Sequence, residues 1–356
     1  MILIMALAAL SSYLGIGMLL RLLKHQQLML DIPNERSSHS QPIPRGGGMI
    51  IVLLSLSGIM LFTLLYQPED MLPVGLLVLG GFCVAIVSWR DDIRPLSNRV
   101  RFATHIFAAI LVVIALASWR QVTLPFVNST NLGWLGIPLT IIWVVGLINA
   151  YNFMDGIDGL AGGVAVVAGL GWALIGWYLH VPMITIFGVI LAASSLGFLG
   201  HNWHPARIFM GDVGSAYLGY AFAVMPLLAL FFLPNQEQSN ALTVFFIGIL
   251  LVWPFLFDTV FTISRRLLNG EKVWTAHRSH LYQRLVINGY PHHVVALLYI
   301  GLAFCGLISA LALVLDLPGS IFILLIWIPL LCVALWRFVL YKESSMQHQF
   351  TQYEKR

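Results

Sequence analysis

The chain has 356 residues, of which 59% are hydrophobic and only 10% are charged, and its mean hydropathy is +0.87. This composition excludes an ordinary soluble domain and indicates an all-α integral membrane protein. The net charge of +4 and the pI near 9.0 accompany no base-reading motif, so we expect contact with anionic lipid heads and not with nucleic acid.

Apolar stretches long enough to cross a bilayer as helices fill most of the chain. We predict eleven, approximately at residues 2–23, 46–66, 71–89, 102–118, 132–149, 159–179, 181–199, 213–232, 240–262, 293–315 and 318–340. Ten is the alternative, because a span that contains a glycine-rich or aspartate-rich segment can be broken. No soluble domain or long linker interrupts the series, so residues 1–356 are expected to form a single bundle.

Basic residues fall almost entirely in alternate loops. The loops after the first, third, seventh and ninth spans hold thirteen of the nineteen, and the C-terminal tail holds three more, whereas the loops on the other side hold only Arg120. The positive-inside rule therefore places the N-terminus outside, and it places the alternate loops and the C-terminal tail in the cytoplasm.

The first cytoplasmic loop, residues 31–48, ends in three consecutive glycines. Backbone N–H groups at a glycine-rich helix start can bind an anion. Basic side chains that would add charge to such a site are Arg36, His39 and Arg45. The alternative is a solvated connector with ordinary positive-inside arginines.

Aspartates at the ends of the other spans carry the main functional signal. A carboxylate beside hydrocarbon is costly unless it is paired, hydrated or bound to a cation, so a group of them on one side suggests a metal-dependent site. Asp91 and Asp92 end the third span and are expected to divide their roles. The alternative for this pair is a salt-bridge cluster with neighbouring arginines.

The loop at 148–163 adds an amide and two further acids. Asn152, Asp155 and Asp158 are spaced by three, the interval that lines side chains along one helical face. Hard oxygen ligands of this kind suit magnesium, which shares its coordination with substrate phosphates. The glycines between them also fit helix packing.

The loop at 200–215 completes the set of acids. Asp212 stands between glycines at the start of the next span, and the N-terminal dipole of that helix points to the same surface. Phe209 can stack on a planar base, although a lone aromatic is more often an interfacial anchor.

These loops together resemble the polyprenyl-phosphate N-acetylhexosamine-1-phosphate transferases, from about residue 31 to 284. The resemblance rests on the paired aspartates, on NFMDGIDGLAGG, on HNWHPARIFMGDVGS and on a histidine motif within WTAHRSHLYQRL. It implies a membrane enzyme that moves a sugar-1-phosphate from a UDP-sugar to undecaprenyl phosphate. UMP would be released, and a cell-surface glycan such as O-antigen would begin on the cytoplasmic face of the bacterial inner membrane.

The resemblance also implies roles for individual residues. Asp212 matches the magnesium-binding aspartate, Asn152 matches a residue that supports the metal or the nucleotide, and Phe209, Asp155 and Asp158 match residues on the uridine side. One of Asp91 and Asp92 would deprotonate or position the lipid phosphate. Diphosphate and sugar would face His277, Arg278 and His280. The expected metal is Mg²⁺, with Mn²⁺ as an alternative, and the expected partners are the two substrates, membrane lipids and a second copy of the chain.

Two departures bear on the sugar. Members that use the peptidoglycan precursor carry a lysine where this chain has Pro95 and a run of histidines where it has HRSH, which argues against that substrate. The N-acetylglucosamine pattern HxxHxR is met at His277 and His280, but Tyr282 occupies the arginine position. We therefore expect UDP-N-acetylglucosamine or a 6-deoxy relative. A secondary transporter and a CDP-alcohol phosphatidyltransferase are the remaining alternatives, and the acids at one face disfavour the first.

Overall fold

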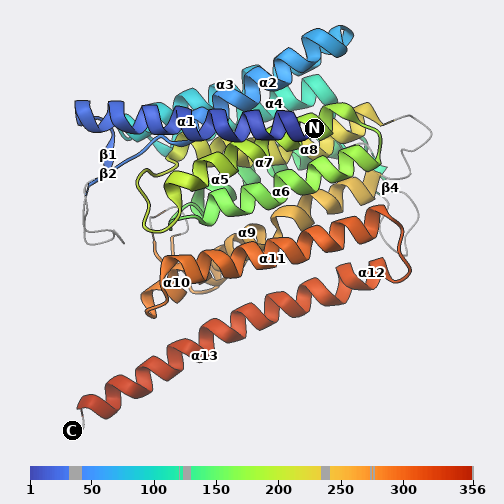
Figure 1. Ribbon diagram of the computed structural model, residues 1–356. Coiled ribbons are helices and arrows are strands. Elements are labelled where there is room, and N and C mark those ends of the chain that lie inside the picture. Colours follow the sequence, from blue (N-terminus) through green and yellow to red (C-terminus); the bar gives the residue numbers. More distant parts are fainter. Residues whose placement is uncertain are drawn as a thin grey trace.

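A computed structural model describes residues 1–31, 42–119, 121–122, 130–233, 241–272, 275 and 277–354 of the chain. Within these ranges the protein is a bundle of helices that run side by side (Figure 1), and two short hairpins are its only sheets. The helices are α1 (Ile2–Gln26), α2 (Gly48–Tyr66), α3 (Met71–Ile93), α4 (Asn98–Leu116), α5 (Gly136–Phe153), α6 (Leu160–Tyr178), α7 (Pro182–Asn202), α8 (Asp212–Phe232), α9 (Ala241–Leu268), α10 (Leu281–Ile287), α11 (His292–Val314), α12 (Ser320–Phe322) and α13 (Ile328–Glu354). The strands are β1 (Leu30–Asp31), β2 (Ile43–Pro44), β3 (Gln121–Val122) and β4 (Thr130–Asn131).

Eleven helices in the described part of the chain are long and apolar enough to cross a membrane, which confirms the predicted all-α polytopic fold. The last predicted span is misplaced. After Gly319 the chain forms α12 and a π-helical turn over Ile323–Trp327, and the candidate span runs from Leu325 to Ser344 within a helix that continues to Glu354. The hydropathy of the sequence does not indicate where α13 ends, because this helix continues through polar residues beyond its apolar part.

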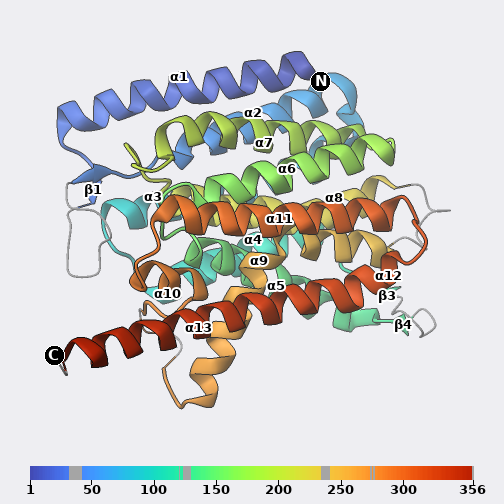
Figure 2. The ribbon, with the colours of Figure 1, turned by 60° about the horizontal axis from the view of Figure 1, so that its bottom comes forward.

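The helix α8 lies at the centre of the bundle. In the apolar stretch of α8, 83% of the residues are buried, against 11% in the apolar stretches of α1 and of the last span. Both of those helices lie at the edge of the bundle (Figure 2). Buried hydrogen bonds fix neighbouring helices to α8: Ser55 and Tyr217 share a hydroxyl contact of 2.7 Å, and Tyr220 donates to the Leu77 carbonyl at 2.9 Å. Such bonds between helices are favourable where lipid offers no alternative partner.

Close approach of α2 and α8 depends on glycine. A Cβ added to Gly48 would lie 2.2 Å from the Cα of Gly214, so any larger residue would push the two helices apart. The backbone N–H groups of Gly47 and Gly48 donate to the carbonyls of Phe209 and Met210, each at 2.9 Å. The interpretation of the glycine triplet as an anion cradle is therefore wrong for these two residues, because their N–H groups already have backbone partners.

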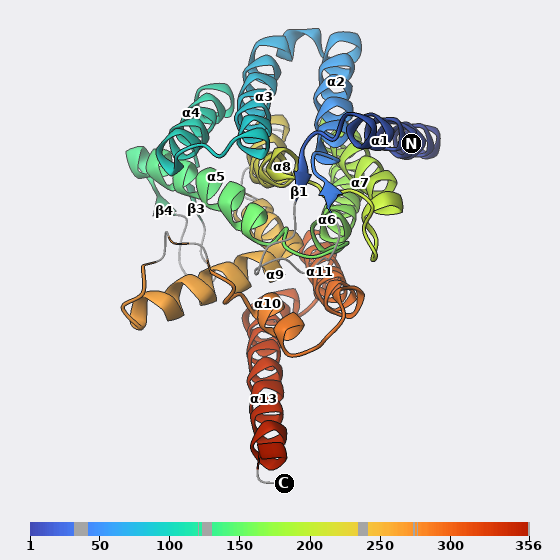
Figure 3. The same cartoon turned by 90° about the vertical axis from the view of Figure 1, so that its left-hand side faces the viewer.

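One end of the bundle, which we call the polar end, holds the connections that follow α1, α3, α5, α7 and α9. In Figure 1 the hairpin of β1 and β2 and the short helix α10 mark this end, and Figure 3 views the molecule onto it. The strand β2 pairs with β1, and its Pro44 carbonyl accepts the N–H of Phe209 at 2.8 Å. The hairpin of β1 and β2 and the loop at 200–215 are thus joined by a backbone hydrogen bond.

Candidate functional site

Asp92 holds the start of α8. Its Oδ1 accepts the backbone N–H of Asp212 at 3.0 Å, and its Oδ2 accepts that of Val213 at 3.1 Å. Gly211, which precedes the helix, has a φ of +77°, and a Cβ there would meet the Asp92 carboxylate at 2.7 Å. The end of α3 therefore caps α8 in place of a local side chain, and both Asp92 oxygens are engaged.

Asp91 points away from its neighbour, toward the side chain of Asp212. Its Oδ2 accepts from Nη1 of Arg101 at 3.0 Å, and the same nitrogen lies 3.6 Å from Oδ2 of Asp212. The two carboxyl groups are also in hydrogen-bonding contact with each other. Two carboxylates in contact repel each other, so Asp91 and Asp212 require a shared proton or a cation besides Arg101.

Asn152 supports Asp212 from the last turn of α5. Its amide oxygen accepts the hydroxyl of Ser215, and its side chain also hydrogen-bonds Asp212. Ser215 in turn donates to the Gly211 carbonyl at 3.1 Å. In this arrangement Asn152 orients Asp212, and its oxygen already has a partner.

The connection between α5 and α6 separates Asp155 from Asp158. We predicted that both acids share a helical face with Asn152, and this is wrong because α5 ends at Phe153 and the loop runs to Gly159, whose φ is +76°. Asp155 remains close to the other acids. Burial, followed by the charges of Asp212 and Asp92, raises its pKa to about 8. Without a cation, this carboxyl group is therefore mostly protonated at neutral pH.

Asp158 faces two histidines instead. Its Oδ2 accepts from Nδ1 of His204 at 2.7 Å and from the N–H of Ala206 at 3.2 Å, and its Oδ1 lies 3.5 Å from Nδ1 of His292. Burial alone would raise the pKa of Asp158, but the imidazoles of His292 and His204 outweigh it and lower the pKa. Asp158 is thus charged, and it faces the two histidines. It does not face Asp91, Asp155 and Asp212, which we call the acidic group.

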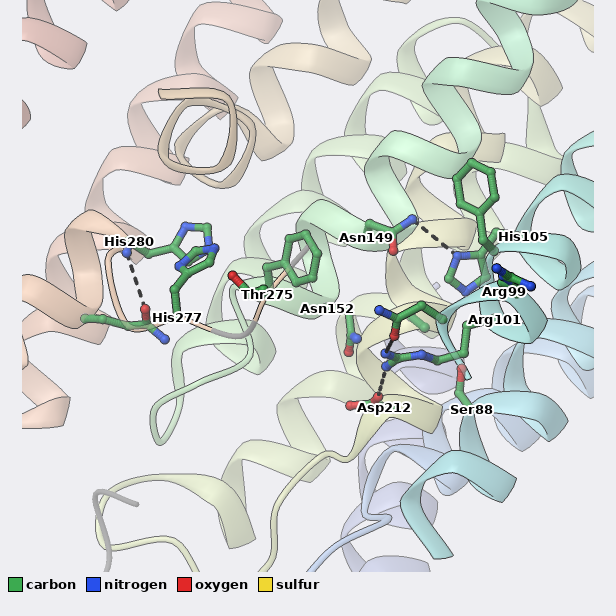
Figure 4. Close-up of a pocket in the computed structure, with 15 residues that line it drawn as sticks. Ser88, Arg99, Arg101, His105, Asn149, Asn152, Asp212, Thr275, His277 and His280 are labelled. Atoms are coloured by element: carbon green, nitrogen blue, oxygen red, sulfur yellow. Dashed lines mark hydrogen bonds and ion pairs between the residues drawn. The ribbon is translucent and has the colours of Figure 1, made fainter. Parts of the chain in front are cut away.

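A pocket of about 680 Å³ opens beside Asp212. Arg101, Asn152 and Asp212 lie on one side of it, and His277 and His280 lie on the other (Figure 4). Further lining side chains are Ser88, Asn98, Arg99, Phe102, His105, Asn149, Phe153, Ala216, Thr275 and Gln283. The pocket therefore lies between a wall that carries Asp212 and an opposite wall that carries His277 and His280, which we call the histidine wall.

Asp258 positions the histidine wall, and sequence reasoning missed it. This fully buried residue of α9 accepts from His280 Nδ1 at 3.1 Å, from the Tyr299 hydroxyl at 2.6 Å and from the N–H groups of Leu281 and Tyr282 at 2.9 and 3.1 Å. It thereby caps α10 and fixes the imidazole of His280. The available signal was an acid inside an apolar span, which by itself marks a functional position.

His277 contributes as a neutral group. Burial, followed by the charges of His280 and Arg266, lowers its pKa to about 4. Its Nδ1 shares a contact of 2.9 Å with the hydroxyl of Ser279. Arg278 is partly exposed in the same segment. Because His277 is neutral, it can exchange hydrogen bonds with a ligand but cannot neutralise an anion.

The remaining predicted residues lie around the hairpin or outside the described ranges. Arg45 forms an ion pair with Asp31, and its charge offsets a part of the rise in the pKa of Asp155. Phe209 is half-buried, and its backbone is paired with the segment around Pro44. His39 and Arg36 fall among residues that the structure does not describe.

The acidic group has the chemistry of a magnesium site. Asp91 and Asp212 bring carboxylate oxygens into contact, and Asp155 adds a third acid whose raised pKa reflects the other acids nearby. Hard oxygen donors around a polar pocket are what Mg²⁺ binds, and the pocket leaves space for the phosphates that usually complete its coordination. The residues therefore fit the ion.

Comparison with known proteins identifies relatives of the chain. Residues 74–230 match the family described as Glycosyl transferase family 4. The chain is 34% identical over 285 residues to a probable undecaprenyl-phosphate N-acetylglucosaminyl 1-phosphate transferase of Bacillus subtilis, covering 80% of this chain and 77% of that protein. It is 31% identical over 317 residues to a decaprenyl-phosphate N-acetylglucosaminephosphotransferase of Mycolicibacterium smegmatis, covering 81% and 76%.

A more partial similarity extends to another activity. The chain is 35% identical over 225 residues to a phospho-N-acetylmuramoyl-pentapeptide-transferase of Clostridium botulinum, covering 60% of this chain and 68% of that protein. All three relatives are named as transferases of a phosphorylated amino sugar or its derivative.

Proposed function

The chain belongs to the polyprenyl-phosphate hexosamine-1-phosphate transferase family, and on that premise we propose that it transfers N-acetylglucosamine-1-phosphate, or a 6-deoxy relative, from a UDP-sugar to undecaprenyl phosphate. UMP leaves, and the lipid-linked product begins a cell-surface glycan. The observation that carries the proposal is the contact of Asp91 with Asp212, bridged by Arg101, at the wall of a pocket large enough for a nucleotide sugar.

The reaction is a displacement at phosphorus. An oxygen of the lipid phosphate forms a bond to the sugar-linked phosphorus, and the bond from that phosphorus to the bridging oxygen breaks, so UMP leaves with the electron pair. Both reactants are anions, and binding them in line lowers the entropic cost of the encounter. A magnesium ion held by Asp212 and Asp91 would neutralise charge on the phosphates.

The chain's own residues supply the positioning. Asp92 fixes the start of α8 and so places Asp212, while Arg101 offers a permanent positive charge at the same wall. Asp155 holds a proton at neutral pH while no cation neutralises its neighbours. We assign the lipid phosphate to the Asp91 side and the sugar to the wall of His277, Arg278 and His280.

We further propose that the polar end faces the cytoplasm of a bacterial inner membrane. The distribution of Lys and Arg supports this orientation, because the loops predicted on this side hold thirteen of the nineteen and the loops on the other side hold only Arg120. O-antigen as the glycan, Mn²⁺ as an alternative ion and a homodimer stay predictions.

The direct test measures UMP release by purified protein with undecaprenyl phosphate and a panel of UDP-sugars. We expect turnover only when a divalent cation and a UDP-N-acetylhexosamine are both present. Asp212→Asn should reduce the rate about a hundredfold or more, because it removes a group that stabilises charge in the transition state. Full turnover by Asp212→Asn would contradict the metal assignment, and absence of UMP with every sugar would contradict the function.

A further inference from the structure

Tyr282 lies behind the histidine wall and joins it to the end of α5. Its side chain is fully buried and is not among the described residues that line the pocket, whereas its neighbours His280 and Gln283 are. The hydroxyl of Tyr282 donates to the carbonyl of Phe153, the last residue of α5, at 3.1 Å. A carbonyl in the last turn of a helix has no partner within that helix, so this bond from α10 satisfies it.

The hydroxyl of Tyr282 also fills the space beside Gly156, in the connection that carries Asp155. A Cβ added to Gly156 would lie 2.0 Å from this oxygen and 3.0 Å from the ring carbon that bears it. The backbone of Gly156 is not in the left-handed region, so its conformation does not itself call for glycine. The missing side chain at Gly156 is therefore matched to the tyrosine hydroxyl.

Two further contacts hold Tyr282 in place. Its backbone N–H donates to Asp258 at 3.1 Å, and its ring packs edge-on against Tyr299, with 6.4 Å between the ring centroids. The ring of His280, which the same Asp258 carboxylate binds, stacks on that of Tyr282 at 6.0 Å. Burial, followed by the charges of Asp258 and Asp155, raises the pKa of Tyr282, so the hydroxyl keeps its proton and remains a donor.

On the basis of the function proposed above, we propose that Tyr282 is a positioning residue that fixes the separation between the histidine wall and the end of α5. The pocket is lined from both sides of this link, by Asn152 and Phe153 in the last turn of α5 and by His280 and Gln283 around the start of α10 (Figure 4). The sugar of the UDP-sugar lies in this space. Hydrogen bonds to a sugar depend on the spacing of the groups that form them, so Tyr282 acts on donor recognition without touching the donor.

The test removes the hydroxyl and its matching space separately. Tyr282→Phe keeps the ring but loses the bond to Phe153, and Gly156→Ala adds the methyl group that the hydroxyl excludes. The control for the hydroxyl is Tyr66→Phe, because Tyr66 ends α2 and is 71% exposed. The control for the methyl group is Gly146→Ala in α5, where a Cβ would meet no other described part of the chain within 4 Å.

Full-length protein in detergent is assayed for UMP release with its preferred UDP-sugar, and UMP, which lacks the sugar, serves as an inhibitor. Tyr282→Phe should raise KM for the UDP-sugar at least about fivefold and lower kcat less, because the groups around the sugar lose their spacing. The inhibition constant of UMP should stay at the wild-type value. A purely structural defect would instead reduce the amount of folded protein, which lowers kcat and leaves KM unchanged.

Melting temperatures test the contact itself. Gly156→Ala should melt several degrees below the wild type, and the double variant with Tyr282→Phe should recover part of this loss, because phenylalanine leaves room for the methyl group. If Gly156→Ala does not fold, recovery of folded protein in the double variant gives the same answer. Neither control should lose donor affinity or stability.

Three results would overturn the proposal: an unchanged KM in Tyr282→Phe, an equal rise in the inhibition constant of UMP, or additive losses of stability in the double variant. Absence of UMP release by the wild type with every UDP-sugar is a separate outcome. It would contradict the proposed function, while the melting temperatures would still show whether Tyr282 and Gly156 are matched.

Discussion

The carboxylate of Asp92, at the end of α3, accepts the backbone N–H of Asp212, 120 residues later, at 3.0 Å. This bond and its counterpart to Val213 make one aspartate of the adjacent pair a support for α8, and the other, Asp91, faces Arg101. The two acids thus act on Asp212 in different ways, one through the backbone and one through the side chain.

Asp92→Ala should therefore impair the metal site indirectly. Loss of the cap should destabilise the protein by about 1 kcal/mol, and the displaced Asp212 should raise the Mg²⁺ concentration for half-maximal activity at least about tenfold. Asp70→Ala is the control, since Asp70 precedes α3 but makes no capping bond. A loss of kcat with unchanged Mg²⁺ dependence and unchanged melting temperature would instead assign Asp92 to proton transfer.

Asp258→Asn should lower kcat through His280. The variant retains only one acceptor oxygen where imidazole, hydroxyl and backbone donors converge, so we expect a roughly tenfold or greater loss of kcat and a lower melting temperature. Tyr299→Phe removes one donor without touching His280 and should lose much less. In the double variant with His280→Ala, the Asp258 change should add little to the loss of kcat. Fully additive losses would show that Asp258 does not act through His280.

Asp155 should make the metal-free protein less stable as the pH rises. Its pKa in the fold is about 8, above its ordinary value of 3.8, so folding favours the protonated form. That stabilisation is complete below about pH 4 and is lost as the pH rises toward 8. Melting temperatures measured in a chelator should fall over this range in the wild type and fall less in Asp155→Asn. Glu69→Gln, at an exposed acid far from the site, should behave as the wild type, and equal slopes in all three would contradict the assignment.

The orientation can be tested by cysteine labelling in intact cells. Glu69 lies between α2 and α3, at the end opposite the polar end, and Asn269 follows α9 at the polar end; both are exposed. In a background without Cys83, Cys305 and Cys332, Glu69→Cys should react with an impermeant thiol reagent and Asn269→Cys should react only after lysis. The reverse pattern would invert the topology.

The sequence predicted the helices well because a membrane-spanning helix has a length and an apolar composition that hydropathy reports directly.

The sequence could not predict which aspartates lie together in the site. Equal spacing suggested one face for Asn152, Asp155 and Asp158, but Gly159 at positive φ ends that regularity and leaves Asp158 to two histidines from other loops. His280 lies 22 residues from Asp258 and Asp212 lies 120 residues from Asp92, so only the packed bundle reveals these two contacts.

Sugar choice is the prediction that depends most on the histidine wall. His277 is neutral and half-exposed in the pocket, so it can exchange hydrogen bonds with sugar hydroxyls but cannot neutralise the diphosphate. If this wall recognises the sugar, His277→Ala, Arg278→Ala and His280→Ala should change the ratio of kcat/KM for UDP-N-acetylglucosamine and its 6-deoxy analogue. A site that pairs with a hydroxyl leaves its own polar groups unsatisfied when that hydroxyl is missing, so the discrimination it provides can be large.

The control for sugar choice is Phe209→Ala. If Phe209 stacks on uracil, its loss should lower kcat/KM for both sugars by the same factor, because both carry the same base. Steady-state kinetics on the wild type and the four variants separate the two effects. An unchanged ratio in all three variants of the wall would mean that these side chains bind only the diphosphate, and the sugar would then have to be recognised elsewhere in the pocket.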